Sequence, residues 1–236
     1  MQQVDAAIAA GTWPTQPVVG LYGWGLNTNG QLALGNRTAY SSPKHVGTLS
    51  DWSSISPGQY FYSAIKTDGT LWTWGNNTYG QLGQGNTTSY SSPKQVGALT
   101  TWSKLGNAYY YVCAIKTDGT LWTWGRNKFG TLGLGNQTYY SSPKQVGALT
   151  TWLNVAASLY HTIAVKTDGT MWVWGQGAVG QLGLGNTFYY SSPKQLGTLT
   201  NWASASCGFQ CSIAVKTDGR SEEHTSELQS RLHLVC

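Results

Sequence analysis

The sequence repeats itself with a period of 50 residues. Residues 64–100 and 114–150 are identical at 30 of 37 positions without a gap, and further copies begin at Ala164 and Ala214. The repeat aligns one tryptophan column at Trp24, Trp74, Trp124 and Trp174 and another at Trp52, Trp102, Trp152 and Trp202. Repeat units of this size stack on one another, because a single unit cannot bury its own apolar face. The period therefore predicts an array of similar units rather than one irregular core.

Each unit contains four short segments that are typical of β-strands. In the third copy they span residues 152–156, 160–166, 170–175 and 194–197, and they are rich in β-branched and aromatic residues. Thr-Asp-Gly joins the second segment to the third and favours a tight hairpin, because glycine accepts positive φ. A long glycine-rich loop that includes Gly180 joins the third segment to the fourth. Helical periodicity is absent, so each unit is predicted to be a four-stranded antiparallel sheet.

Four antiparallel strands at a fixed period describe one blade of a β-propeller. We therefore expect an all-β fold built from four-stranded antiparallel blades. Within the third strand, residues 121–124 read Leu-Trp-Thr-Trp and alternate between the two faces of the sheet. Both indoles then point to one side, so each blade is expected to pack a tryptophan pair against one neighbour. The tryptophan columns are accordingly predicted to form the core between blades.

Composition agrees with a turn-rich β-protein and excludes several other classes. Charged residues make up only 10% of the chain, which has 30 glycines, 12 tryptophans and 14 tyrosines. A disordered chain lacks such aromatics, and no run of about 20 apolar residues is present to form a membrane-spanning helix. The net charge of +5 comes mainly from lysines spread evenly along the repeats, without a cluster. Membrane insertion and nucleic-acid binding are therefore not expected.

The repeat also contains a specific motif. Residues 74–86 read WGNNTYGQLGQGN, Pro93 follows them, and residues 114–125 read AIKTDGTLWTWG. This pattern extends over residues 20–219 and resembles the repeat of the regulator of chromosome condensation (RCC1) family. The resemblance implies a β-propeller, which in that family typically has seven blades. It does not decide function, because family members include a guanine nucleotide exchange factor, a plant photoreceptor and a β-lactamase inhibitor.

The repeat predicts how the chain is organised. Residues 20–219 are expected to be the propeller region, and residues 1–19 are an unrelated N-terminal segment. The propeller region starts with a third and a fourth strand and ends with a first and a second strand at residues 202–216. Three full blades are expected between them, over residues 52–97, 102–147 and 152–197. In the resembled family, strands from both ends of the chain share one blade and so close the ring. We expect this chain to be a truncated piece of such a larger, seven-bladed ring. The piece is expected to stay an open arc and to self-associate. Closure as a four-bladed ring is the alternative.

Residues 220–236 do not continue the repeat. They hold all three glutamates of the chain, and their first part, RSEEHTSELQS, resembles the conceptual translation of a sequencing adapter. We therefore expect an artefactual, disordered tail, with a short polar tail as the alternative, and we assign no metal site to His224, His233 or Cys236. The N-terminus lacks the basic and apolar regions of a secretory signal. The compartment stays open, with the cytoplasm or a virion as settings.

Variation among the copies points to one end of the blades. The second-to-third turns and the links between blades are nearly constant, whereas the first-to-second and third-to-fourth loops vary and are rich in tyrosine. Large rigid side chains on variable loops of a rigid scaffold are typical of a binding surface. The candidate binding residues are Tyr60, Phe61, Tyr79, Tyr109, Tyr110, Phe129, Tyr139, Tyr160, His161, Phe188, Tyr189 and Phe209. Packing beneath the loops is the alternative role for each of them.

No constellation of residues indicates catalysis, a cofactor or a metal. His45 and His161 each stand alone, without a neighbouring serine or cysteine arrangement, and the aspartates of the Thr-Asp-Gly turns have structural places. Cys207 and Cys211 lack further zinc ligands. The glycine-rich loop lacks the Lys-Ser/Thr of a phosphate-binding loop. We therefore expect a protein that is not an enzyme and has no cofactor.

Two functions remain open. The first is a non-catalytic protein-interaction scaffold that binds a protein partner through the tyrosine-rich loops, for example as a bacterial or phage surface or structural protein. The second is a regulatory RCC1-type propeller that acts on a small GTPase, as a guanine nucleotide exchange factor, or on chromatin. A basic patch on one face would favour the second function. Evenly spread charge with an aromatic face would favour the first.

Overall fold

The computed structural model describes residues 20–48 and 50–217, which form sixteen β-strands and no helix. The strands are β1 (Tyr22–Gly25), β2 (Tyr40–His45), β3 (Trp52–Pro57), β4 (Phe61–Lys66), β5 (Leu71–Gly75), β6 (Tyr90–Gln95), β7 (Trp102–Asn107), β8 (Tyr111–Lys116), β9 (Leu121–Gly125), β10 (Tyr140–Gln145), β11 (Trp152–Ala157), β12 (His161–Lys166), β13 (Met171–Gly175), β14 (Tyr190–Gln195), β15 (Trp202–Cys207) and β16 (Ser212–Lys216). Within these ranges there is no long apolar helix that could cross a membrane. The predicted N-terminal segment 1–19 and tail 220–236 lie outside the described residues.

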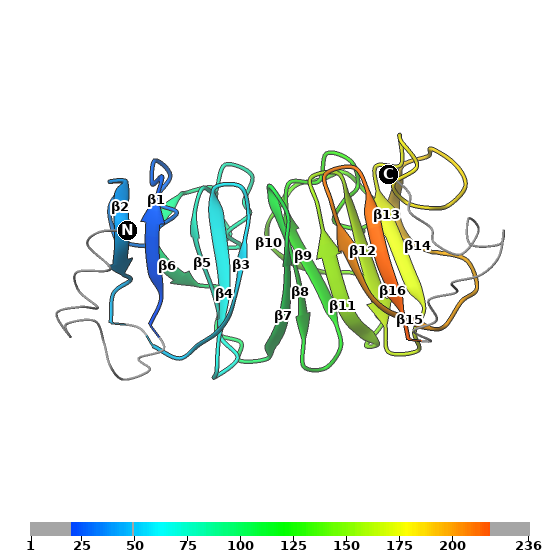
Figure 1. The fold of residues 1–236 in the computed structure, drawn as a ribbon, viewed down its shortest axis with the longest axis horizontal. Helices are drawn as coiled ribbons and strands as arrows, with labels where there is room; N and C mark the ends of the chain where they lie inside the picture. The colour runs from blue at the N-terminus through cyan, green and yellow to red at the C-terminus, as the bar shows by residue number, and fades with distance from the viewer. Residues whose placement is uncertain (1–19, 49, 218–236) are drawn as a thin grey trace, which may run out of the picture.

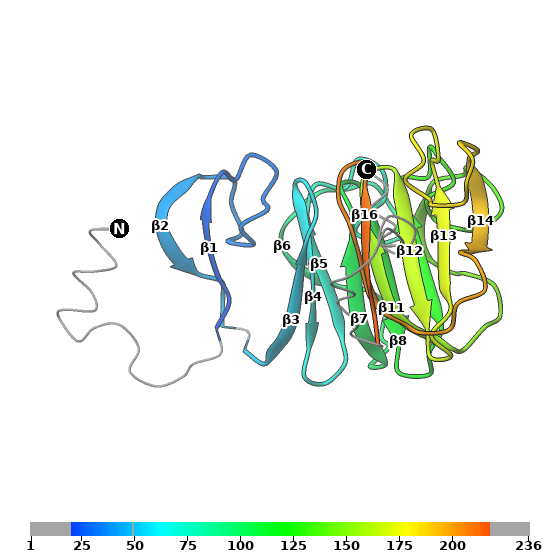
Figure 2. The same cartoon turned by 45° about the vertical axis from the view of Figure 1, so that its right-hand side comes forward.

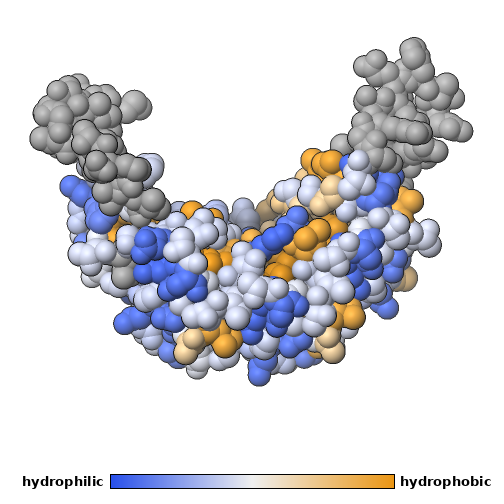
Figure 3. Space-filling view, turned by 90° about the horizontal axis from the view of Figure 1, so that it is seen from below, coloured by the Kyte–Doolittle hydropathy of each residue, from blue (hydrophilic) through white to orange (hydrophobic). Residues whose placement is uncertain are grey.

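The strands form blades that follow one another along the chain (Figures 1 and 2). Three sheets are four-stranded antiparallel meanders, β3 to β6, β7 to β10 and β11 to β14, and we call them the first, second and third blades. The pairs β1–β2 and β15–β16 form two-stranded sheets at the two ends. Figure 3 shows the described residues arranged as a curved arc. The prediction of four-stranded antiparallel blades is confirmed, and the blades form a partial ring.

The fourth strand is longer than predicted. In the third blade it is β14, which begins at Tyr190 and includes Pro193, whereas the sequence pattern predicted a start at Lys194. The register between β13 and β14 shifts between the pair Val173–Lys194 and the pair Gly175–Tyr190. A proline lacks an N–H for a central ladder, but an edge strand with an irregular register accommodates it. The fourth strand is the edge of its blade, so this position tolerates proline.

Each second-to-third turn is held by its own aspartate. In the first blade the Asp68 carboxylate accepts hydrogen bonds from the Thr70 backbone N–H at 2.9 Å and from the Thr70 hydroxyl at 2.6 Å. These hydrogen bonds lower the pKa of Asp68. Gly69 adopts a φ of +77°, which glycine reaches without strain. The Thr-Asp-Gly sequence therefore forms the predicted tight hairpin.

The tryptophans of the third strand pack against the preceding blade. Trp124 of β9 is fully buried among Phe61, Leu71 and Leu82 of the first blade. Its indole Nε1 donates to the backbone carbonyl of Gln81, 43 residues earlier, at 2.9 Å. The indoles of Trp74 and Trp174 make the equivalent bonds to Gln31 and Thr131. The tryptophan columns thus form the core between blades, as the sequence predicted.

The long third-to-fourth loop crosses to the next blade. In the second blade, the Gly135 N–H donates to the Ser191 carbonyl of β14 at 2.7 Å. Gly130 passes so close that a Cβ there would lie 2.6 Å from the Ser191 Cα. Equivalent contacts join the first blade to the second and the β1–β2 pair to the first blade. These crossings fix the loops to the scaffold.

The two ends of the blades differ as the sequence predicted. The first-to-second and third-to-fourth loops share one end, where the Arg126 N–H donates to the Tyr110 carbonyl at 3.0 Å. The hairpin turns and the inter-blade links share the other end, where the Thr117 N–H donates to the Thr101 carbonyl at 2.8 Å. We call these the loop end and the turn end. The variable segments of the sequence therefore lie together at the loop end.

Candidate functional site

Aromatic side chains from successive blades meet at the loop end. They come from the loops of the first, second and third blades and from the loop between β15 and β16. We call this set the aromatic face, and it consists of Tyr79, Tyr109, Tyr110, Phe129, Tyr139, Tyr160, Tyr189 and Phe209.

The rings of the aromatic face contact one another in an unbroken series. The centroid distances are 5.8 Å for Tyr139–Tyr79, 5.2 Å for Tyr79–Tyr110, 6.2 Å for Tyr110–Tyr109, 6.0 Å for Tyr109–Phe209, 5.0 Å for Phe209–Tyr160, 5.4 Å for Tyr160–Phe129 and 6.2 Å for Phe129–Tyr189. All but the tilted Tyr160–Phe129 pair are T-shaped. Contacts of this geometry each contribute about 1 kcal/mol beyond area burial, so the rings hold one another in place.

Much of this surface is open to solvent. Phe209 is 51% exposed, Tyr189 47% and Tyr139 43%, while Tyr79 and Tyr160 are half-buried beneath them. Tyr60 and Phe188, which the sequence also predicted as binding residues, are exposed in loop-end segments. The exposed rings offer contact area to a partner, and the half-buried rings that they contact hold them in a fixed arrangement.

Two of the sequence-predicted residues do not lie on the surface. Phe61 and His161 are 0% exposed, and each is the first residue of the second strand of its blade. Phe61 packs against Trp124 in the core between the first and second blades. The sequence pattern started the second strand of the third blade at Tyr160, one residue too early. Every residue of β12 is buried, so His161 lies in the core as its first residue.

His161 is the centre of a buried hydrogen-bond chain that joins the third blade to β16. Its Nδ1 lies 2.9 Å from the Ser158 hydroxyl, and its Nε2 lies 2.8 Å from the Ser212 hydroxyl. The Ser212 hydroxyl donates to the Gln181 carbonyl at 2.7 Å, so it accepts from Nε2–H. Burial lowers the pKa of His161 to about 4. The imidazole is therefore a neutral structural group between two blades.

A buried asparagine fixes the third-to-fourth loop of the second blade. Asn127 is fully buried, and its Nδ2 donates to the carbonyls of Asn136 at 2.9 Å and Thr138 at 3.1 Å. Its Oδ1 accepts from the Leu132 N–H at 2.9 Å. Asn27 and Asn77 make the same bonds in the two preceding repeats. These clamps hold the segment that presents Phe129 and Tyr139.

The carboxylate side chains of the described residues lie at one end of the blades only. The aspartates of the described residues lie at the turn end, at Asp51 in a link and at Asp68, Asp118 and Asp168 in the hairpin turns. The loop end has Arg37, Arg126 and Lys128 and, within residues 20–48 and 50–217, no carboxylate side chain. The aromatic face therefore lies in a locally positive setting.

Two cations contact rings of the aromatic face, and neither is among the binding residues predicted from the sequence. The Arg126 guanidinium carbon lies 5.2 Å from the ring centroids of both Tyr79 and Tyr110. Lys128 is exposed, with its ammonium 5.4 Å from the Phe129 centroid. The other repeats have uncharged residues at both positions. That contrast between copies was the signal that could have identified the pair.

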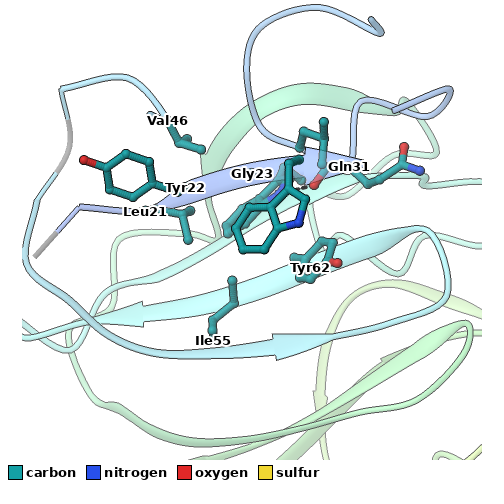
Figure 4. A pocket seen from close by; sticks show the side chains of 10 residues that line it. Leu21, Tyr22, Gly23, Gln31, Val46, Ile55 and Tyr62 are labelled. Carbon is teal, nitrogen blue, oxygen red and sulfur yellow. Dashed lines mark hydrogen bonds between the residues drawn. The ribbon is translucent and has the colours of Figure 1, made fainter. Parts of the chain in front are cut away.

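The cavities elsewhere in the described residues are lined mainly by apolar side chains. The one in Figure 4 has a volume of about 270 Å³ and lies between the β1–β2 pair and the first blade. Leu21, Val46 and Ile55 line it, beside the bond from the Trp74 indole to the Gln31 carbonyl. Among the described residues, no group of three or more potential metal-ligating side chains occurs. This cavity is an apolar gap between blades.

Comparison with known proteins agrees with the fold. The family model of the regulator of chromosome condensation (RCC1) repeat matches residues 20–65, 68–115, 118–165 and 168–215, and a second model of that repeat matches residues 52–81 and 152–181. The chain has no significant match among curated protein sequences.

Solved structures of similar fold include human WBSCR16, at 20% identity and a TM-score of 0.74, covering 85% of this chain and 54% of that one. Prp20p from Saccharomyces cerevisiae is similar at 23% identity and a TM-score of 0.72, with 83% of this chain and 51% of that one covered. Yeast RCC1 (Prp20) bound to Kap60 aligns with a TM-score of 0.70 at 23% identity, over 84% of this chain and 50% of that one. The chain spans about half the length of these structures.

The four matched repeats cover most of the chain, and each of them contains the last two strands of one sheet and the first two strands of the next. The chain belongs to the regulator of chromosome condensation (RCC1) repeat family.

Proposed function

We propose that this protein is a non-catalytic interaction scaffold that binds a protein partner through the aromatic face. The observation that supports the proposal is the unbroken series of eight rings across the loop end. Tyrosine and phenylalanine are enriched at protein interfaces, where rigid rings give contact area at low entropic cost. The asparagine clamps and the inter-blade crossings hold the loops in advance, which lowers the cost of binding.

Two matched variants test this function. The first replaces Tyr109, Tyr139 and Tyr189 with serine, and the second replaces Leu99, Leu149 and Leu199 with serine. The leucines are the matched control, because they are similarly exposed but lie in the links at the turn end. Partners captured from extracts of the source cells are identified by mass spectrometry.

We expect a set of proteins that binds the wild type and the leucine variant but not the tyrosine variant. Thermal unfolding is measured for all three proteins in parallel. A tyrosine variant that unfolds at much lower temperature, or that retains every partner, would show that the rings serve packing instead.

The regulatory function remains the second candidate. Its support is that Prp20p, one of the proteins of similar fold, binds Gsp1p and histones. The described lysines favour the scaffold instead, because every blade has them, two in the first and third blades and four in the second, and those four lie on β7, β8, β10 and the loop after β9. Stimulated nucleotide release from a small GTPase would support the regulatory candidate. The uniform repeats favour a bacterial or phage surface or structural protein as the setting of the scaffold.

A further inference from the structure

We propose that the partner presents an acidic peptide segment with an aromatic or large aliphatic residue, and that Arg126 and Lys128 bind its carboxylates. The inference rests on the proposed function of the aromatic face and names the chemistry of its partner.

The two cations of the aromatic face have no acidic side chain near them among the described residues. Arg126 and Lys128 are the cations of the second blade's third-to-fourth loop, and the described part of the loop end offers no carboxylate to neutralise them. The nearest described aspartates are in the turns and links at the opposite end of the blades. An incoming carboxylate therefore meets no competing acidic side chain, and the local field favours its approach.

The side chain of Arg126 is already fixed in position by its neighbours. Its side chain is held between the rings of Tyr79 and Tyr110, and its buried Nε has no hydrogen-bond acceptor among the described residues. A guanidinium offers five N–H donors in a planar fork that matches a carboxylate. Since the rings already fix the side chain, little rotamer freedom is lost when a carboxylate binds.

The surface beside the two cations forms a small hollow, which is lined by Arg126, Lys128, Tyr110, Phe129 and Leu159. It joins both positive groups to an aromatic and aliphatic wall. An acidic residue followed by a large apolar one fits this combination, because the first pairs with the cations and the second covers the wall.

The ring geometry favours a peptide over a single-stranded nucleic acid. Nucleic acids stack their bases on open ring faces. Here the rings meet edge to face, with interplanar angles of 70° for Tyr79–Tyr110 and 77° for Tyr160–Phe209, so that neighbouring edges cover ring faces. Exposed ring edges and hydroxyls suit side-chain contacts instead.

The repeat itself supplies a variant that should fold. The first blade has Asn76 and Thr78 where the second has Arg126 and Lys128. The double variant Arg126→Asn/Lys128→Thr therefore uses residues that the scaffold already accepts at these positions. The control Lys94→Thr/Lys144→Thr removes the same charge from exposed positions on β6 and β10.

The experiment selects binders from a display library of short random peptides and measures the best one by fluorescence anisotropy. We expect enriched sequences to combine Asp or Glu with an aromatic or large aliphatic residue. The Kd of such a peptide should rise at least about tenfold when the protein is the variant Arg126→Asn/Lys128→Thr, because charge-assisted hydrogen bonds are lost. The same rise is expected when the wild-type protein binds a peptide in which Asn or Gln replaces Asp or Glu. The lysine control should bind as the wild type does, and affinity should fall with salt.

Other outcomes separate this inference from the proposed function. Enrichment of neutral or basic peptides, or binding that Arg126→Asn/Lys128→Thr leaves unchanged, would overturn the acidic preference while the aromatic face still binds peptides. If a thymidine oligonucleotide displaced the peptide and bound more tightly, the acidic-peptide proposal would be wrong and the aromatic face would be a nucleic-acid-binding surface. If no selected peptide needed Tyr109 and Tyr139 for binding, the proposed function itself would be contradicted.

Discussion

Burial makes His161 an acid-sensitive residue of the core between blades. The imidazole is 0% exposed and is hydrogen-bonded as the neutral form to Ser158 and Ser212. A buried imidazolium lacks the hydration that it has in the unfolded chain, and the pKa accordingly falls from 6.5 to about 4. As pH falls, the unfolded chain therefore takes up the proton first.

We predict that the free energy of unfolding falls between pH 6.5 and pH 4, by on the order of 3 kcal/mol. The contribution of His161 to the free energy of unfolding is complete above pH 6.5 and is lost as the pH falls toward the folded-state pKa of about 4. The hairpin aspartates titrate below this window, because hydrogen bonds from Thr70, Thr120 and Thr170 lower their pKa from 3.8. Urea unfolding at a series of pH values measures the effect.

The variant His161→Phe uses the residue that the first blade has at this position, Phe61. It should show a flatter pH profile between 6.5 and 4, even if the lost hydrogen bonds make it less stable at pH 7. His45→Gln is the matched control, since His45 is exposed and the other repeats have glutamine there. An unchanged profile in His161→Phe would refute the assignment.

Asn127 is the second residue whose contribution can be isolated. Replacement by alanine leaves two carbonyls and the Leu132 N–H without their partners in a buried place. We predict a loss of about 3 kcal/mol, from unsatisfied groups that cost about 1–3 kcal/mol each, reduced by partial access of water. Faster hydrogen exchange at Leu132 would locate the effect in the loop.

Gln84→Leu is the control for this loop, because the other repeats have leucine at that position. It should change stability little. If Asn127→Ala were equally neutral, the loop would owe its shape to the inter-blade crossing rather than to the asparagine clamp.

At the scale of elements, a glycine of the long loop and a glycine of an inter-blade link show the difference between lack of space and an unfavourable backbone conformation. Gly130 and Gly147 have similar φ values of +74° and +60°. A Cβ at Gly130 would lie 2.6 Å from the Ser191 Cα, whereas a Cβ at Gly147 would meet no atom within 4 Å. The two sites therefore share the conformational requirement and differ in the approach of the next blade.

We predict that Gly147→Ala lowers the free energy of unfolding by about 1–2 kcal/mol, the cost of a left-handed residue with a side chain. Gly130→Ala should lose at least about 1–3 kcal/mol more, because the third blade must move away from the loop. Chemical denaturation of both variants measures the difference. Equal losses would show that the crossing is loose enough to accept a methyl group.

The elements were predictable to different degrees, for physical reasons. The strand pattern, the Thr-Asp-Gly turns and the tryptophan core follow from the repeat, because the same local rules act four times on nearly the same residues. The contact between Tyr109 and Phe209 was not predictable, since it depends on how two separate loops approach each other across blades. Arg126 differs in charge from the residues at its position in the other copies, but its contacts with Tyr79 and Tyr110 arise only in the folded arc.

At the scale of the whole molecule, the two ends of the arc present complementary faces. Trp24 of β1 is 59% exposed, whereas Trp124 at the same position of the second blade is 0% exposed. Ile213 and Val215 of β16 are 55% and 58% exposed, whereas Ile163 at the former position is 2% exposed. Within the described residues, the outer edges of β1 and β16 also have no neighbouring strand. Exposed faces and edges of this kind favour pairing.

The register of the complete blades specifies that pairing. In the third blade Thr162 lies opposite Trp174 and Ile163 opposite Val173. Shifted by the repeat, the same register places Ser212 of one copy opposite Trp24 of another. A head-to-tail contact between copies would then rebuild a four-stranded blade. We therefore predict that this chain associates with increasing concentration, as measured by analytical ultracentrifugation.

Two variants that each break one end test the direction of this contact. Trp24→Lys places a charge at the β1 end, and Ile213→Lys/Val215→Lys places charges at the β16 end, so each variant alone should stay monomeric. In a mixture, the intact β16 of the first variant can still pair with the intact β1 of the second, and heterodimers should form. A contact between two identical ends would behave differently, because one of the two variants would then associate as the wild type does. A mixture that stays monomeric, or variants that associate alone, would contradict the head-to-tail pairing.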